Sequence, residues 1–221
     1  MDDFEPLDLG KFRDIVRRES ARLRLRPGPD EREITFTLAL ALSAAVKKIF
    51  YEKSATVFSD EPRIMIKPVV HYAQRMRIDA MEKYNAPSVF SVIQLGVNEE
   101  ALGRQEYQMT VIIYLERKFL PEFLRLLQYP YIDSDDDLEA KDGCGAVVNL
   151  IVGQYKNEMA ILGYKDLTMS HFESFINTAV DGVGIPKGVF DKYEIDFEIE
   201  EANRLVIEMM TLPSLPKNIQ R

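Results

Sequence analysis

The sequence predicts an α+β domain. It contains a long apolar helical pattern near residues 33–53, a pair of β-branched segments in the middle, and a second long helical pattern that is followed by further strands. Runs of strands and helices in this mixed order favour an α+β architecture over an alternating parallel sheet. The composition is that of a folded domain, because 46% of the 221 residues are hydrophobic and 29% are charged.

Residues 1–32 are predicted to be an N-terminal helical extension. The segment 11–26 has an amphipathic helical pattern, and the Pro-Gly-Pro-Asp sequence at 27–30 ends it. Its arginines are interpreted as a solvated helical face, with a docking strip for an acidic partner as the alternative. These arginines are Arg17, Arg18, Arg22, Arg24 and Arg26.

The main domain is predicted to span residues 33–212. The centre of the helix at 33–53 is apolar almost all round, which is typical of a helix buried on most of its surface. The segments 88–97 and 107–115 are rich in β-branched residues and are predicted to be strands.

The second half of the domain begins with a short helix at Pro121, because proline is tolerated in the first turn of a helix. A long helix is predicted for residues 138–163, and residues 213–221 are predicted to be a loose tail. Strands are predicted at 166–172, and at 193–199 and 204–212 as a hairpin.

The overall charge and the single cysteine exclude several classes of function. A net charge of -8 is unfavourable for nucleic-acid binding, which needs clustered Lys and Arg. Cys144 has no partner for an internal disulfide, so a reducing compartment is expected, and it is interpreted as a packed small residue. The sequence has neither a secretory signal pattern nor a run of 18 apolar residues, so a cytoplasmic protein without a membrane span is expected.

Three polar segments have ordinary structural interpretations. The acidic run 133–137 is expected to be a solvated loop that favours the start of the following helix, because it lacks the glycine and distal glutamate of a calcium loop. The glycine-rich segment 181–188 lacks the phosphate-loop spacing and is expected to be a mobile surface loop. His71 and His171 are isolated, so no metal site is predicted.

The helix within residues 142–159 carries the most unusual pattern in the chain. Glycine costs about 1 kcal/mol relative to alanine inside a helix, so glycines at this spacing suggest that something approaches the backbone closely. That object is either a neighbouring element of the fold or a docked partner that needs Asn149 exposed. The residues three or four apart on this face are Asp142, Gly145, Asn149, Gly153 and Lys156.

The stretch Asn149-Leu-Ile-Val-Gly153-Gln-Tyr-Lys156 resembles the Asn-Met-Ile-x-Gly-Asn-x-Lys stretch of the CheX-like chemotaxis phosphatases, relatives of CheC and FliY. The resemblance covers residues 35–212. Its flanking parts are the strands at 88–96 and 110–115, the acidic entry at 133–142, and the closing hairpin at 197–199 and 205–209.

The resemblance implies an antiparallel-rich sheet with two long helices packed on it, and a homodimer as in many members. It also implies hydrolysis of the aspartyl phosphate on a CheY-like receiver domain, without a cofactor. In that family an asparagine orients the attacking water, and a glutamate three residues earlier anchors the receiver's active site. The asparagine corresponds to Asn149. The remaining residues expected to contact the partner are Asp142, Gly145, Ala146, Gly153 and Lys156.

The sequence departs from the family at the glutamate, because Ala146 stands there, and at His171, where the family tends to have proline. Asp142 is the nearest carboxylate on this face, and its distance from Asn149 is about 10 Å along the helix axis. Three functions therefore remain open. They are a receiver-binding protein with weak or no phosphatase activity, a non-catalytic interaction module of a signalling or motility complex, and a small-molecule domain whose glycines line a pocket.

Overall fold

The computed structural model describes residues 30–58, 61–69, 71–72, 75–79, 82–199 and 203–218. The helix predicted at 11–26 lies outside these residues.

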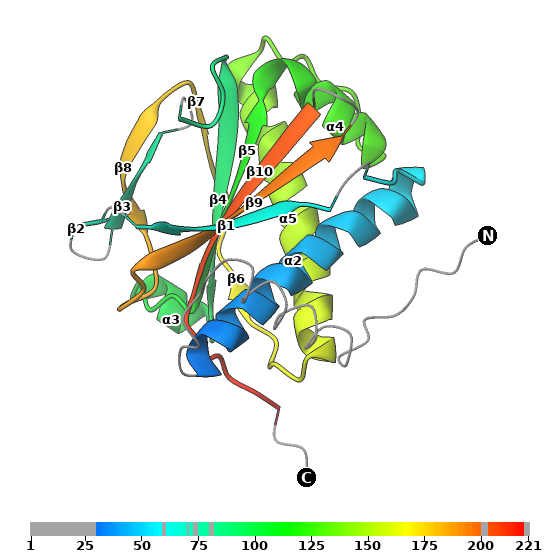
Figure 1. The fold of residues 1–221 in the computed structure, drawn as a ribbon. Helices are drawn as coiled ribbons and strands as arrows, with labels where there is room; N and C mark the ends of the chain where they lie inside the picture. Colours follow the sequence, from blue (N-terminus) through cyan, green and yellow to red (C-terminus); the bar gives the residue numbers. More distant parts are fainter. Residues whose placement is uncertain are drawn as a thin grey trace.

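A seven-stranded sheet forms the centre of the molecule, and all of its strand pairs are antiparallel (Figure 1). The strand order is β1-β9-β10-β5-β4-β6, and β7 also pairs with β4. The sheet is therefore antiparallel as predicted. Its strands are β1 (Arg63–Pro68), β4 (Ser88–Gly96), β5 (Met109–Glu116), β6 (Thr168–Met169), β7 (Glu173–Ile176), β9 (Asp191–Ile199) and β10 (Asn203–Thr211).

Both predicted long helices are present and lie on the same face of the sheet (Figure 1). They are α2 (Asp30–Ser54) and α5 (Asp137–Ile161), each of 25 residues. They pack on each other, and α5 also packs on β4, so that the larger hydrophobic core fills the space between helices and sheet. Lys48 of α2 and Glu158 of α5 form an ion pair of 3.2 Å across the helix contact.

Helix α2 satisfies the length and composition test for a membrane span over Glu31–Ser54, although 56% of its apolar window is buried inside the protein. Burial against α5 and the sheet explains why its sequence is apolar almost all round. Helix α5 begins where the acidic run predicted it to begin, because the Asp136 side chain accepts hydrogen bonds from the backbone N–H groups of Leu138 and Glu139.

A second, three-stranded sheet covers part of the opposite face (Figure 1). It consists of β2 (His71–Tyr72), β3 (Arg75–Asp79) and β8 (Ala179–Gly184), and it encloses a smaller hydrophobic core. The prediction of a surface loop at residues 181–188 is therefore wrong for residues 181–184, which belong to β8. The absence of a side chain at Gly184 makes room for the Tyr107 ring, since an added Cβ would lie 2.3 Å from the ring.

Several shorter elements also differ from the predictions. Residues 166–172 form only the two-residue strand β6, and β7 follows after Phe172. The turn between β4 and β5 contains the short helix α3 (Glu99–Gly103), which was not predicted. The short helix predicted at Pro121 is present as α4 (Leu120–Leu126), preceded by a 3-10 turn (Arg117–Phe119).

The described part of the predicted loose tail is held in place. The backbone N–H of Asn218 donates to Gly163, and the backbone N–H of Lys165 donates to Pro216. Leu215 is buried. The tail is therefore fixed as far as residue 218, to the turn that follows α5.

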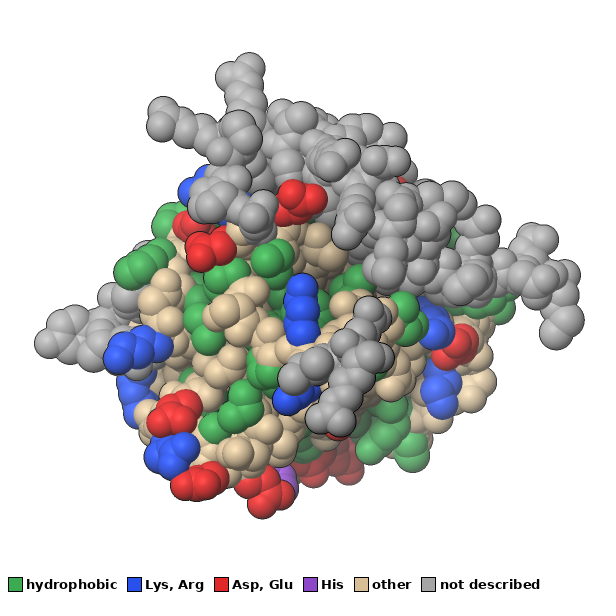
Figure 2. Space-filling view, turned by 90° about the horizontal axis from the view of Figure 1, so that it is seen from below, with side chains coloured by type: hydrophobic (Ala, Val, Ile, Leu, Met, Phe, Trp, Pro, Cys, Tyr) green, Lys and Arg blue, Asp and Glu red, His purple; other side chains and the backbone are tan. Residues whose placement is uncertain are grey.

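One face of the molecule is viewed from below in Figure 2, where acidic and basic side chains are interspersed. The described residues visible there form no basic patch of the kind that contact with a phosphate backbone requires.

A buried network of charges lies on the sheet face opposite the long helices. Glu208 is fully buried, accepts hydrogen bonds from Lys83 (2.5 Å) and the Tyr114 hydroxyl (2.8 Å), and forms an ion pair of 2.6 Å with Lys192. Glu194 on the adjacent strand binds Lys67 (2.7 Å) and Lys83. Because Lys83 bridges both carboxylates, it ties the segment after β3 to β9 and β10.

The network sets the ionisation of its members. Burial works against the charge of Lys83, but the attraction of Glu208 and the hydrogen bonds with Glu194 and Glu208 outweigh it and raise the pKa of Lys83. Burial similarly disfavours ionised Glu194, but the hydrogen bonds from Lys67 and Lys83 outweigh it and lower the pKa of that carboxyl.

We expect Glu208→Gln to lower the free energy of unfolding by about 3–5 kcal/mol, because two partly buried ammonium groups lose a fully buried charged partner. Urea unfolding followed by circular dichroism measures this. The matched control is Glu100→Gln, which removes an exposed ion pair with Arg104 and should change stability by less than about 1 kcal/mol. Equal effects of the two substitutions would show that the network contributes no more stability than an exposed ion pair.

The network should also make stability fall in acid. A carboxyl with a lowered folded-state pKa contributes stability above its unfolded value, which is near 4.5, and loses it as the pH falls through the folded value. The unfolding free energy should therefore drop below about pH 4.5, and Glu194→Gln should flatten that drop. Unfolding curves collected between about pH 3 and 7 test this, and an unchanged slope in the variant would contradict it.

Candidate functional site: the exposed face of helix α5

Helix α5 is buried on most of its circumference and exposed along one narrow face. Its inner residues contact β4, β5, β7, α2 and α4. Asp142 and Asn149 are exposed on the outer side, and Gly153 and Lys156 are half-buried there. These four residues are called the α5 stripe. The structure brings together four of the six predicted site residues on this surface, and it places the other two, Gly145 and Ala146, below it as buried residues.

Asn149 lies in the middle of the α5 stripe. Its side chain makes no hydrogen bond with any residue that the structure describes. A carboxamide offers two N–H donors and an acceptor oxygen, so Asn149 presents its full hydrogen-bonding capacity to solvent or to a partner. The exposure also argues against the small-molecule hypothesis, which a buried Asn149 above a cavity would have supported. Two cavities beside α2 are lined by described residues, none of which belongs to α5.

No described carboxylate takes the place of the missing glutamate. Ala146 is only 8% exposed. Glu158 points toward α2, where it binds Lys48 and accepts a hydrogen bond from Gln154. Glu139 accepts from the backbone N–H of Asp133 in the loop before the helix. The α5 stripe therefore has an amide at its centre and its only carboxylate, Asp142, two turns away.

The glycines of α5 have different explanations. An added Cβ at Gly145 would lie 2.1 Å from the Phe172 ring, and one at Gly143 would lie 2.9 Å from both Ile132 and Leu124. Tight packing within the fold accounts for these two positions. An added Cβ at Gly153 would meet nothing within 4 Å. The missing side chain at Gly153 is therefore not required by the packing of the described residues, although it keeps the surface beside Asn149 flat.

The border of the α5 stripe is fixed by contacts with the segment after the helix. Lys156 forms an ion pair of 2.9 Å with Asp166. Ser170 is anchored to β4, because its backbone N–H donates to Gln94 (2.8 Å) and its hydroxyl accepts from the backbone N–H of Gln94 (3.0 Å). His171 follows as an exposed residue, and Phe172 then packs on Gly145.

Cys144 is a buried core residue rather than a nucleophile. Burial raises the pKa of its thiol to about 12, and a hydrogen bond with Ser91 opposes this only in part. The neutral thiol lies between α5 and β4. Among the described residues no three His, Cys, Asp or Glu side chains are grouped so that they could hold a metal ion.

The two glycines should respond to alanine in opposite ways. Gly153→Ala should raise the unfolding free energy by about 0.5–1 kcal/mol, because it improves helix propensity in open space. Gly145→Ala should lower it by about 1–3 kcal/mol, because the Phe172 ring must move. Thermal and urea unfolding of both variants provide the measurement. A destabilising Gly153→Ala would mean that something in the folded chain already occupies that space.

No protein-family model matches the sequence, and no match to a curated protein was found. Solved structures are similar in fold at low sequence identity. FliY from Thermotoga maritima has a TM-score of 0.50 and 12% identity, covering 85% of this chain and 92% of FliY.

Two further structures are similar at lower TM-scores. CheX from Desulfovibrio desulfuricans has a TM-score of 0.47 and 13% identity, with 78% of this chain and 97% of CheX covered. CheX from Borrelia burgdorferi, solved in complex with CheY, BeF3 and Mg²⁺, has a TM-score of 0.39 and 13% identity, with 78% and 96% covered. The likeness to FliY extends over most of both chains, and the chain therefore has the CheC/CheX/FliY fold.

Proposed function

We propose that this protein binds a phosphorylated CheY-like receiver domain through the α5 stripe, with Asn149 directed at the aspartyl phosphate. The observation that carries the proposal is the exposed Asn149 without a hydrogen-bond partner among the described residues, on a helix fixed by packing on three sides. The CheC/CheX/FliY fold and the resemblance of residues 149–156 to the CheX-like motif also support it.

The surface around Asn149 suits the approach of another backbone. Gly153, one turn after Asn149, leaves open space beside the amide. A receiver loop could therefore approach the helix closely enough for the amide to reach its phosphorylated aspartate. The glycine that the fold does not require would then be explained by the partner.

Asn149 has the hydrogen-bonding groups to position water for hydrolysis. The amide oxygen can accept a hydrogen bond from water, and the amide N–H can donate to a phosphoryl oxygen. Orientation of the water in line with the leaving carboxylate is the main contribution that a protein makes to such a transfer. A fixed helix supplies that orientation without a cofactor.

Hydrolysis is expected to be slow. The anchoring glutamate is replaced by the buried Ala146, and no described carboxylate lies beside Asn149 to take its role. The same observation favours a second function, a non-catalytic module that holds a receiver within a signalling or motility complex. Either function would be carried out in the cytoplasm, where receiver domains act. A homodimer remains a prediction from the resemblance.

We expect the wild-type protein to bind one of the CheY-like receivers of its source organism and to accelerate loss of the phosphoryl group by less than about tenfold. Asn149→Ala should abolish that acceleration, whereas Ala146→Glu should increase it by about tenfold or more by supplying the missing anchor. The measurements are decay of acetyl-phosphate-labelled receivers and, separately, receiver affinity by calorimetry.

Glu198→Gln is the matched control, because Glu198 is exposed on β9, away from α5. If Asn149→Ala leaves affinity intact and the wild type does not accelerate decay, the non-catalytic module is the correct function. If no receiver binds in either phosphorylation state, receiver recognition is refuted. Thermal unfolding of Ala146→Glu must show a folded protein, since position 146 is buried.

A further inference from the structure

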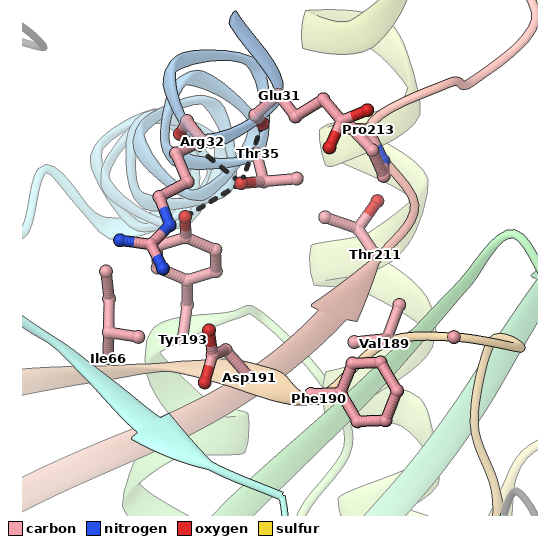
Figure 3. Close-up of a pocket in the computed structure, with 11 residues that line it drawn as sticks. Glu31, Arg32, Thr35, Ile66, Val189, Phe190, Asp191, Tyr193, Thr211 and Pro213 are labelled. Carbon is pink, nitrogen blue, oxygen red and sulfur yellow. Dashed lines mark hydrogen bonds between the residues drawn. The ribbon is translucent and has the colours of Figure 1, made fainter. Parts of the chain in front are cut away.

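A separate cavity lies at the start of α2, between this helix and the ends of β1, β9 and β10 (Figure 3). Its volume is about 250 Å³. Pockets for drug-sized ligands are commonly about 300–1,000 Å³, so this cavity suits a smaller molecule. Its polar lining comes from distant parts of the chain and consists of Glu31, Arg32, Thr35, Asp191, Tyr193 and Thr211.

The charged groups of this cavity face one another without pairing. Arg32 and Asp191 both act electrostatically on Tyr193, which lies between them, and Glu31 lies on the far side of the opening (Figure 3). None of these three side chains forms an ion pair or hydrogen bond with a residue that the structure describes. One guanidinium and two carboxylates therefore leave the cavity with an excess of negative charge.

The hydroxyl groups add a further acceptor. The Thr35 hydroxyl lies within hydrogen-bond distance of the backbone oxygens of Glu31 (3.2 Å) and Arg32 (3.3 Å), so its hydrogen is used inside the helix. The Tyr193 hydroxyl, 2.8 Å from Thr35, must then donate to Thr35. Its own oxygen keeps its lone pairs free to accept a hydrogen bond.

The remaining wall is apolar and supports the tyrosine. Ile66 and Val189 line the cavity with Phe190, opposite the polar groups of α2. Tyr193 is 5% exposed, and burial raises the pKa of its hydroxyl. The hydroxyl therefore stays protonated at neutral pH, which preserves the hydrogen bond to Thr35 and the orientation of the acceptor oxygen.

We propose that this cavity binds a small amine that also carries an anionic group, with the size and chemistry of a free amino acid. The ammonium group is held by the Asp191 carboxylate and by the Tyr193 oxygen, and the Glu31 carboxylate across the opening adds to the negative charge that attracts it. The anionic group is held by the Arg32 guanidinium, which favours carboxylate partners. An apolar side chain is accommodated against Ile66 and Val189. This site is independent of the α5 stripe and of receiver binding.

The probes are the twenty L-amino acids, tested by calorimetry on the full chain. At least one should bind with a Kd below about 1 mM, which is an affinity within reach of two charge-assisted contacts. The N-acetyl derivative of that amino acid removes the ammonium, and the methyl ester removes the carboxylate. Each should bind at least about tenfold more weakly.

Asp191→Asn and Arg32→Gln should each raise the Kd for the amino acid by about tenfold or more. Tyr193→Phe should raise it by a smaller factor, because it removes one neutral acceptor. Glu198→Gln, on the same strand as Asp191, is the matched control and should bind like the wild type. The proposal is overturned if no amino acid binds at about 10 mM. It is also overturned if both derivatives bind as tightly as the parent, a comparison that does not depend on any variant folding.

Discussion

The packing of α5 between β4 and α2 is the constraint on which the candidate site depends. Gly145 allows the Phe172 ring to lie against the helix backbone, and Cys144 is buried toward Ser91 of β4. With its inner side committed to the sheet and to α2, the helix cannot rotate without opening the main core. The exposed position of Asn149 is therefore a consequence of how the opposite side of the same helix is packed.

The two faces of the central sheet are stabilised by different interactions. The helix-covered face is apolar, whereas the other combines a smaller apolar core with the charge network around Glu208 and Lys83. Lys83 fixes the segment between the two sheets through two buried carboxylates, so loss of one partner leaves unpaired charge in the interior. The α5 stripe is separated from this network by the sheet, so each can be tested by substitution without direct contact with the other.

The sequence was informative where a pattern was long and local. Both long helices, the β4–β5 pair and the closing hairpin follow from periodicity over about nine residues or more. β1 has only three apolar residues between Arg63 and Lys67, and β3 alternates charged and apolar residues over only five residues. β8 contains two glycines, so pairing with neighbouring strands rather than a long sequence pattern makes these segments strands. The glycines at 145 and 153 are equivalent in sequence and differ only in what packs on them. The cavity proposed to bind an amino acid is lined by residues near positions 31, 191 and 211, which are far apart in the sequence. No local sequence motif therefore marks it.

The most direct test of the α5 stripe as a docking surface is its protection from a thiol reagent. The native Cys144 is buried with a raised pKa and gives little background. Asn157→Cys places a reactive thiol one turn beyond Gly153, and Glu198→Cys places one on β9 as a control. Saturating beryllofluoride-activated receiver should slow maleimide labelling at position 157 by about fivefold or more and leave position 198 unchanged. Equal labelling rates at position 157 with and without bound receiver would contradict the account.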